Sequence, residues 1–140
     1  MYTRTRSLPP SRIVGANLDH AIISDGSVIQ PGSTIERSIV GIRGRIGRNV
    51  VLRESVLIGA DRYETDEERA ENERRGRPNL TIGDNCVIER AILDKDCRIG
   101  HGVRIRGADG APDRETEHYV SRDGIVVIPR GVCVPDGMVI

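Results

Sequence analysis

The 140 residues include no tryptophan, no phenylalanine and only three tyrosines. Proteins that hold single-stranded nucleic acids stack the bases on aromatic rings, and this chain has almost none to offer. Its 21 basic and 21 acidic side chains give a net charge of zero, which also argues against binding through phosphate backbones. No apolar run approaches the ~20 residues of a transmembrane helix, and no signal-like segment opens the chain. We therefore expect a cytoplasmic domain that binds neither nucleic acid nor membrane.

Cysteine is also scarce. The chain has three cysteines, an odd number, and none of them is in C-x-x-C spacing. This arrangement disfavours both a disulfide framework and a zinc site, so we predict no metal ligands in the chain.

The core must instead be built from small branched side chains. Isoleucine and valine together number 31 against six leucines, a bias that favours strands because β-branched side chains pack well on a pleated surface. Sixteen glycines and seven prolines supply frequent turns. The composition predicts strands and tight turns with little helix.

Aliphatic residues recur mostly in steps of six, but Ile35 to Ile46 and Ile88 to Ile99 span eleven residues, as though one step had shortened to five. The positions that carry this period are Ile23, Ile29, Ile35, Ile46, Leu52, Ile58, Ile82, Ile88, Ile99, Ile105, Ile128, Val134 and Ile140. A small or β-branched residue lies two positions earlier in most units: Ala21, Ser27, Ser33, Val50, Val56, Cys86, Cys97, Val103 and Val132. Such hexapeptide units are typical of a parallel β-helix, in which equivalent positions stack above one another. Both sets of side chains are expected to point inward, which would bury the thiols of Cys86 and Cys97 as inert groups. An irregular β-sandwich is the alternative that such alternation leaves open.

The period predicts the domain boundaries. Residues 1–17 lack it and are interpreted as an interdomain linker, which leaves 18–140 as the β-helix domain, with about four to five coils. Two polar stretches, about 59–80 and 106–124, interrupt the period and are predicted to be surface insertions, the first with a helix-compatible run over 65–75.

Five segments resemble one known family. They are YTRTRSLPPS at 2–11, SIVGIR at 38–43, GADRYET at 59–65, RAILDK at 90–95 and SRDGIVVI at 121–128. In this order they are similar to the linker and C-terminal β-helix of ADP-glucose pyrophosphorylases (glucose-1-phosphate adenylyltransferases), with the closest likeness to the cyanobacterial and plant small-subunit-like branch. The resemblance implies an all-β fold, a left-handed parallel β-helix of hexapeptide repeats with two surface insertions.

The resemblance also implies a function. The family joins ATP and glucose 1-phosphate into ADP-glucose and diphosphate in a separate N-terminal catalytic domain that uses Mg²⁺. No phosphate-binding glycine loop of standard spacing occurs here, so no catalytic residues and no cofactor are expected in this chain. Its β-helix is expected to contact other subunits in a homo-oligomer, to adjoin the absent catalytic domain and to bind an anionic effector: a sugar phosphate, a phosphoglycerate or phosphate.

The effector-binding residues implied by the resemblance are Arg4 and Arg6 in the linker, Asp94 and Lys95 in the Asp-Lys turn, and Arg130 near the C-terminal end. At position 130 the family has lysine; arginine keeps the charge and can bind phosphate bidentately. Lys95 is the only lysine beside 20 arginines. Because most basic residues are solvated on the protein surface, the alternative is that these residues are surface charges that bind no ligand.

The histidines leave one alternative function. Hexapeptide acyltransferases use a turn histidine as general base, and His101 lies in a Gly-His-Gly turn. No carboxylate is spaced to orient His101 or His118, and with His20 they are interpreted as solvated turn residues. A freestanding acyltransferase and a ligand-free structural module therefore remain the alternatives.

Overall fold

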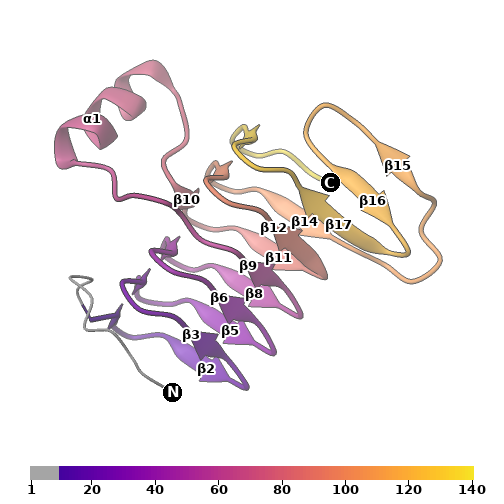
Figure 1. The fold of residues 1–140 in the computed structure, drawn as a ribbon, viewed down its shortest axis with the longest axis horizontal. Helices are drawn as coiled ribbons and strands as arrows, with labels where there is room; N and C mark the ends of the chain where they lie inside the picture. The colour runs from indigo at the N-terminus through magenta and orange to yellow at the C-terminus, as the bar shows by residue number, and fades with distance from the viewer. Residues whose placement is uncertain (1–9) are drawn as a thin grey trace.

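The computed structural model describes residues 10–140, whose fold is built from short, mostly parallel strands in three sheets (Figure 1). The first sheet contains β1 (Arg12–Ile13), β4 (Val28–Ile29), β7 (Arg45–Ile46), β10 (Thr81–Ile82), β13 (Arg98–Ile99) and β18 (Cys133–Val134). The second contains β2 (Asn17–Asp19), β5 (Thr34–Glu36), β8 (Val51–Arg53), β11 (Val87–Glu89) and β14 (Arg104–Arg106). The third contains β3 (Ile22–Ile23), β6 (Ile39–Val40), β9 (Val56–Leu57), β12 (Ala91–Leu93), β17 (Ile125–Ile128), β16 (Val120–Arg122) and β15 (Arg114–Glu115).

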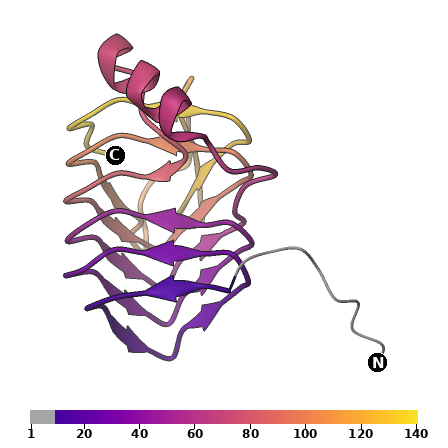
Figure 2. The same cartoon turned by 90° about the vertical axis from the view of Figure 1, so that its left-hand side faces the viewer.

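Each coil contributes one strand to each sheet, and Figure 2 shows the coils stacked along one axis. The in-register pairs show the repeat: Thr34 on β5 lies beside Val51 on β8, and Val87 on β11 lies beside Arg104 on β14. Such stacking lets every coil satisfy its backbone hydrogen bonds on its neighbours. The predicted left-handed parallel β-helix is confirmed, and the β-sandwich alternative is wrong. The first coil already includes β1 and β2, so pairing begins at Arg12, within the segment interpreted as linker.

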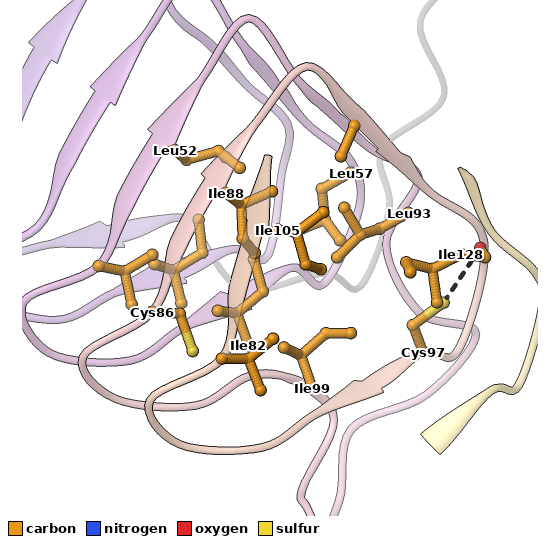
Figure 3. Packing of buried hydrophobic residues seen from close by; sticks show 14 of the residues in the cluster. Leu52, Leu57, Ile82, Cys86, Ile88, Leu93, Cys97, Ile99, Ile105 and Ile128 are labelled. Atoms are coloured by element: carbon orange, nitrogen blue, oxygen red, sulfur yellow. Dashed lines mark hydrogen bonds between the residues drawn. The ribbon is translucent and has the colours of Figure 1, made fainter. Parts of the chain in front are cut away.

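The core is a column of aliphatic side chains inside the coils (Figure 3). The predicted inward residues that are fully buried are Ile29, Ile35, Ile46, Leu52, Ile82, Ile88, Ile99, Ile105, Ile128 and Val134. Cys86 and Cys97 are buried among them as predicted, and the Cys97 thiol donates to the Ile128 carbonyl at 3.6 Å and to that of Pro129 at 3.3 Å. Burial raises the pKa of Cys86 to about 11 and that of Cys97 to about 12, so both thiols stay protonated at neutral pH.

The inward assignment of Ile58 and Val56 is wrong by one residue. Ile58 is 39% exposed, whereas Leu57 beside it is 1% exposed and Ser55 is buried. The cause is the corner between the second and third sheets. In each coil a single residue with positive φ forms this corner: Arg37, Glu54 and Arg90 have φ of 45°, 47° and 51°. This short corner makes every third step five residues long, so Val40, Leu57 and Leu93 point inward.

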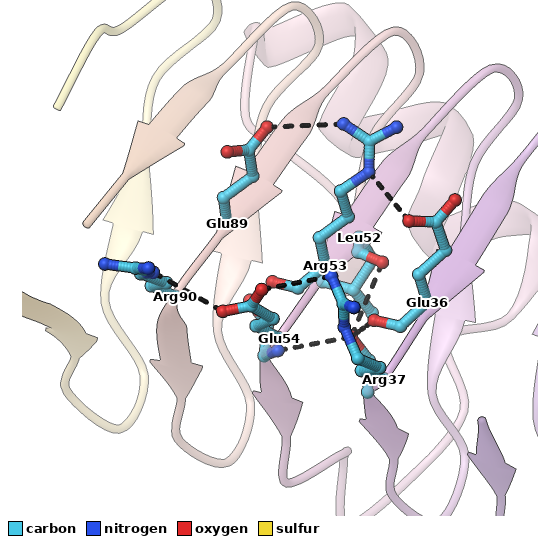
Figure 4. A network of polar contacts seen from close by, with 9 residues as sticks. Glu36, Arg37, Leu52, Arg53, Glu54, Glu89 and Arg90 are labelled. Atoms are coloured by element: carbon cyan, nitrogen blue, oxygen red, sulfur yellow. Dashed lines mark hydrogen bonds and ion pairs between the residues drawn. The ribbon is translucent and has the colours of Figure 1, made fainter. Parts of the chain in front are cut away.

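Charged side chains line this corner in alternating order (Figure 4). Glu54 lies between Arg37, at 3.1 Å, and Arg90, at 3.4 Å. In the adjacent column Arg53 lies between Glu36, at 3.1 Å, and Glu89, at 3.6 Å. Because the coils stack in register, opposite charges on successive coils meet directly, although each exposed pair contributes little by itself.

Two excursions leave the coils (Figure 1). The first carries α1 (Asp66–Arg75), which begins at a capping box between Thr65 and Glu68 and ends at Gly76 in the left-handed conformation. The second forms a hairpin whose strand β16 pairs antiparallel with β17 and so covers the edge of the third sheet. Among residues 10–140, no helix combines the length and apolar composition needed to cross a membrane.

Candidate functional site

The corner between the third and first sheets brings Lys95 and Arg130 together. Lys95 lies in the turn between β12 and β13, and Arg130 lies in the equivalent turn one coil further on, between β17 and β18. The backbone N–H of Gly131 donates to the Lys95 carbonyl at 2.9 Å, which holds the two turns in contact. Stacking of equivalent turns therefore juxtaposes two cations that are far apart in the sequence.

Both cations contact Asp61, which the first excursion contributes. The Lys95 Nζ lies 3.1 Å from Asp61 Oδ1, and an Arg130 guanidinium nitrogen donates to Asp61 Oδ2 at 3.0 Å. We name the set Asp61, Lys95 and Arg130 the Asp61 corner. The hydrogen bond from Lys95 lowers the pKa of Asp61, so this carboxylate stays charged at neutral pH.

Asp96 fixes the position of Asp61. Its Oδ1 accepts from the Asp61 backbone N–H at 2.9 Å, and its own N–H donates to the Gly59 carbonyl at 3.0 Å. Asp96 Oδ2 also lies 3.9 Å from Arg130. Two cations and two carboxylates thus meet, and the group as described is electrically balanced.

The remaining predicted effector residues fall elsewhere. The Asp94 carboxylate accepts from the Lys95 backbone N–H at 2.7 Å, so it stabilises the turn, and among residues 10–140 it forms no ion pair with Lys95 or Arg130. Arg4 and Arg6 lie outside the described residues. Asp61 and Asp96 were missed by sequence reasoning; the only signal was the place of Asp61 within the GADRYET segment.

A buried ion pair anchors the excursion that carries Asp61. The side chains of Arg98 and Glu64 are 10% and 3% exposed, and they meet at 2.7 Å. Glu64 also accepts from the Asn72 amide at 2.6 Å and from the Leu80 N–H at 2.7 Å, while Arg98 donates to the Pro78 carbonyl at 3.1 Å. Burial raises the pKa of Glu64, but the hydrogen bonds from Arg98, Leu80 and Asn72 outweigh it and leave that pKa lowered.

An aromatic contact fixes the same excursion further along the corner. Tyr63 donates its hydroxyl to the Gly26 carbonyl at 2.9 Å, and the Arg43 guanidinium lies 5.8 Å from the centre of the Tyr63 ring. Arg43 also donates to the Ala60 carbonyl at 3.3 Å. The loop is therefore held on both sides of Asp61.

The histidines do not form a catalytic group with one another. His101 accepts the Asp84 backbone N–H on Nδ1 at 2.8 Å, and the Asp84 carboxylate is 3.9 Å from the same nitrogen. His20 pairs with its neighbour Asp19 at 2.7 Å in an exposed position, and His118 lies 3.8 Å from Glu117. In residues 10–140 no three His, Cys, Asp or Glu side chains are grouped so that they would hold a metal ion.

A protein-family model matches this chain. The model of the GLGC left-handed parallel beta-helix domain matches residues 6–139, which is nearly the whole chain and includes both excursions. The match covers the coils, the Asp61 corner and Arg6 of the N-terminal segment.

Proposed function

The chain belongs to the family of GLGC left-handed parallel β-helix domains, and from this premise we propose that it is the regulatory and oligomerisation domain of a glucose-1-phosphate adenylyltransferase. The proposed parent reaction converts ATP and glucose 1-phosphate into ADP-glucose and diphosphate in glycogen or starch synthesis, in the cytoplasm. The YTRTRSLPPS and GADRYET segments support a place in the cyanobacterial and plant small-subunit-like branch.

One observation carries the regulatory part of the proposal: Lys95 and Arg130 converge on the two oxygens of one carboxylate. A carboxylate with a cation on each oxygen occupies the position that a phosphate oxygen pair would take, and arginine binds both groups with the same fork geometry. A dianionic effector carries more charge than Asp61, so it competes for the same donors. Arg4 and Arg6 are the proposed additional cations.

The effector would act through exchange of partners. When it binds Lys95 and Arg130, Asp61 loses both side-chain contacts, while Asp96 still holds its backbone N–H. An effector shifts an equilibrium only by its differential affinity for the two states, and this exchange of ion pairs supplies such a difference. Inorganic phosphate, phosphoglycerate and sugar phosphates share the chemistry required.

Activation curves of the complete adenylyltransferase test the regulatory role. We expect Lys95→Ala to raise the half-activating phosphoglycerate concentration by about ten- to hundredfold, because one charge-assisted contact is lost. Arg37→Ala is the matched control, since Arg37 pairs with Glu54 at a different corner. If Lys95→Ala abolishes turnover without effector while effector affinity is untouched, the regulatory assignment is wrong.

The outer face of the third sheet supports the oligomerisation part. Ile22, Ile39 and Ile92 are 62%, 41% and 36% exposed and stack in register through Val56. A continuous aliphatic stripe on a flat sheet is typical of a protein interface, and we propose a second copy of this chain as its occupant.

Sedimentation velocity tests that interface. Ile39→Lys should shift the chain toward the monomer, and Ile42→Lys, which changes an equally exposed isoleucine at a turn, should not. A wild-type chain that remains monomeric at high micromolar concentration would contradict this part of the proposal alone.

A further inference from the structure

A cleft lies between α1 and the first sheet. It is at the C-terminal ends of the strands of that sheet, whereas the Asp61 corner is at their N-terminal ends. The volume of the cleft is about 310 Å³, enough for a small ligand. The residues that line it come from β7, β10 and β13, from the stacked turns that follow β4, β7, β10 and β13, and from the first excursion. None of them belongs to the Asp61 corner.

Three arginines converge on this cleft from separate parts of the fold. Arg45 lies on β7, Arg48 lies in the following turn, and Arg69 lies on α1. We name them the arginine cleft. Among residues 10–140 none of the three guanidiniums lies within 4.0 Å of a carboxylate or donates a side-chain hydrogen bond, whereas Arg62, Arg74 and Arg75 around the same helix are all paired with glutamates.

Arg45 shows why this arrangement favours a ligand. Its side chain is half-buried, and burial followed by the charge of Arg69 lowers its pKa. Both causes mean that its charge is less well stabilised than in water, because it loses hydration beside a like charge. An anion placed between the two guanidiniums supplies the counter-charge that offsets both effects.

Neutral groups complete the lining. The side-chain amides of Gln30 and Asn79 offer donors, and His101 accepts the Asp84 N–H on Nδ1, so the neutral ring carries its proton on Nε2.

Two carboxylates also line the cleft. Asp84 is engaged at 2.8 Å by the backbone N–H of Arg48, and Glu73 is exposed. The side chains lining the cleft carry one net positive charge with His101 neutral, and the guanidiniums provide the fork-shaped donors that match phosphate oxygens.

We propose that the arginine cleft binds a small phosphate-bearing molecule, at a site separate from the Asp61 corner. Three guanidiniums and a volume of about 310 Å³ favour a ligand with more than one phosphate-sized oxyanion group over a single inorganic phosphate. The carboxylates of Glu73 and Asp84 accept hydrogen bonds from hydroxyl groups of such a ligand. The site consists of residues of this chain alone and does not depend on the proposed function.

Calorimetric titration of the 140-residue chain with inorganic diphosphate, at low ionic strength, tests this site. We expect saturable binding that Arg69→Gln weakens by about tenfold or more, because one charge-assisted contact is lost. Arg74→Gln is the matched control: it lies on the same helix, it pairs with Glu71 and it does not line the cleft. Inorganic phosphate should bind more weakly than diphosphate.

A second pair of measurements locates the binding. Arg45→Gln should weaken diphosphate binding as Arg69→Gln does, and diphosphate should shift the backbone amide resonances of Gly83 and Gly100, which line the cleft. Binding that Lys95→Gln removes and Arg69→Gln leaves intact would assign the ligand to the Asp61 corner and overturn the proposal. Equal loss in Arg69→Gln and Arg74→Gln, or no binding at millimolar diphosphate, would also overturn it.

Discussion

Asp61 and Lys95 form an ion pair of 3.1 Å between the first excursion and the turn that joins β12 to β13, where Asp96 Oδ1 also holds the backbone of Asp61. Arg130 binds the other oxygen of the same carboxylate. Asp61 is therefore an anion of the protein itself at the corner where the proposed effector binds. Removing Asp61 should raise the affinity for the effector, whereas removing Lys95 or Arg130 should lower it.

Asp61→Asn should lower the half-activating concentration of phosphoglycerate in the complete adenylyltransferase. The amide keeps the size of the side chain and leaves the backbone hydrogen bond to Asp96 in place, but it removes the charge that competes for Lys95 and Arg130. Since both ion pairs are exposed, we expect an effect of roughly two- to tenfold, measured from activation curves. An unchanged or raised half-activating concentration would mean that Asp61 does not compete with the effector.

Glu64→Gln should destabilise the chain by about 3–5 kcal/mol at pH 7, because it leaves the buried Arg98 guanidinium without a counter-charge. Urea unfolding measures this difference. Glu71→Gln is the control, since its ion pairs with Arg74 and Arg75 are exposed and should contribute at most about 1 kcal/mol. Equal costs for the two variants would contradict the anchoring role of Glu64.

The same glutamate predicts a pH dependence. The pKa of Glu64 is lowered in the folded chain, so its contribution to stability is complete above the ordinary glutamate pKa, about 4.3, and is lost as the pH falls through the lowered value. The wild-type chain should therefore lose stability below about pH 5 more steeply than Glu64→Gln does. Parallel loss in both chains would show that other carboxylates govern acid unfolding.

The cysteines should divide into one reactive and two unreactive thiols. Cys133 is partly exposed, whereas Cys86 and Cys97 are buried and have raised pKa values. Ellman's reagent at pH 8 should label one thiol quickly and the other two only as the chain unfolds. Cys133→Ser should abolish the fast phase; rapid labelling of two or three thiols would contradict the burial of the core cysteines.

Most of the fold could be predicted because the repeat is visible in the spacing of individual aliphatic residues along the sequence. The buried residues Ile29 and Ile35 are six residues apart, and so are Ile46 and Leu52, so a six-residue period is visible without knowledge of tertiary contacts. The eleven-residue spacings from Ile35 to Ile46 and from Ile88 to Ile99 indicated a shortened step in each. The corner at Glu54 was missed, since positive φ at a charged residue has no strong local signature.

The candidate site was less predictable than the fold. Lys95 and Arg130 were named from a resemblance, and the structure brings them together. The carboxylate between them was missed because Asp61 comes from an excursion outside the repeat. The pairing of Glu64 with Arg98 and the convergence of Arg45 with Arg69 are also contacts between the excursion and the coils, which no periodicity encodes.

The corrected frame of the third sheet yields a final prediction. Leu57 and Ile58 are adjacent and both aliphatic, yet Leu57 is 1% exposed and Ile58 is 39% exposed. Leu57→Asp buries an unpaired carboxylate in the aliphatic column and should cost more than about 4 kcal/mol, enough to unfold the chain or lower its thermal midpoint sharply. Ile58→Asp places the same charge at a solvent-exposed turn and should lower the midpoint only slightly. Thermal unfolding followed by circular dichroism compares the two variants. The reverse order of stability would mean that Ile58 points inward and that this corner has no five-residue step.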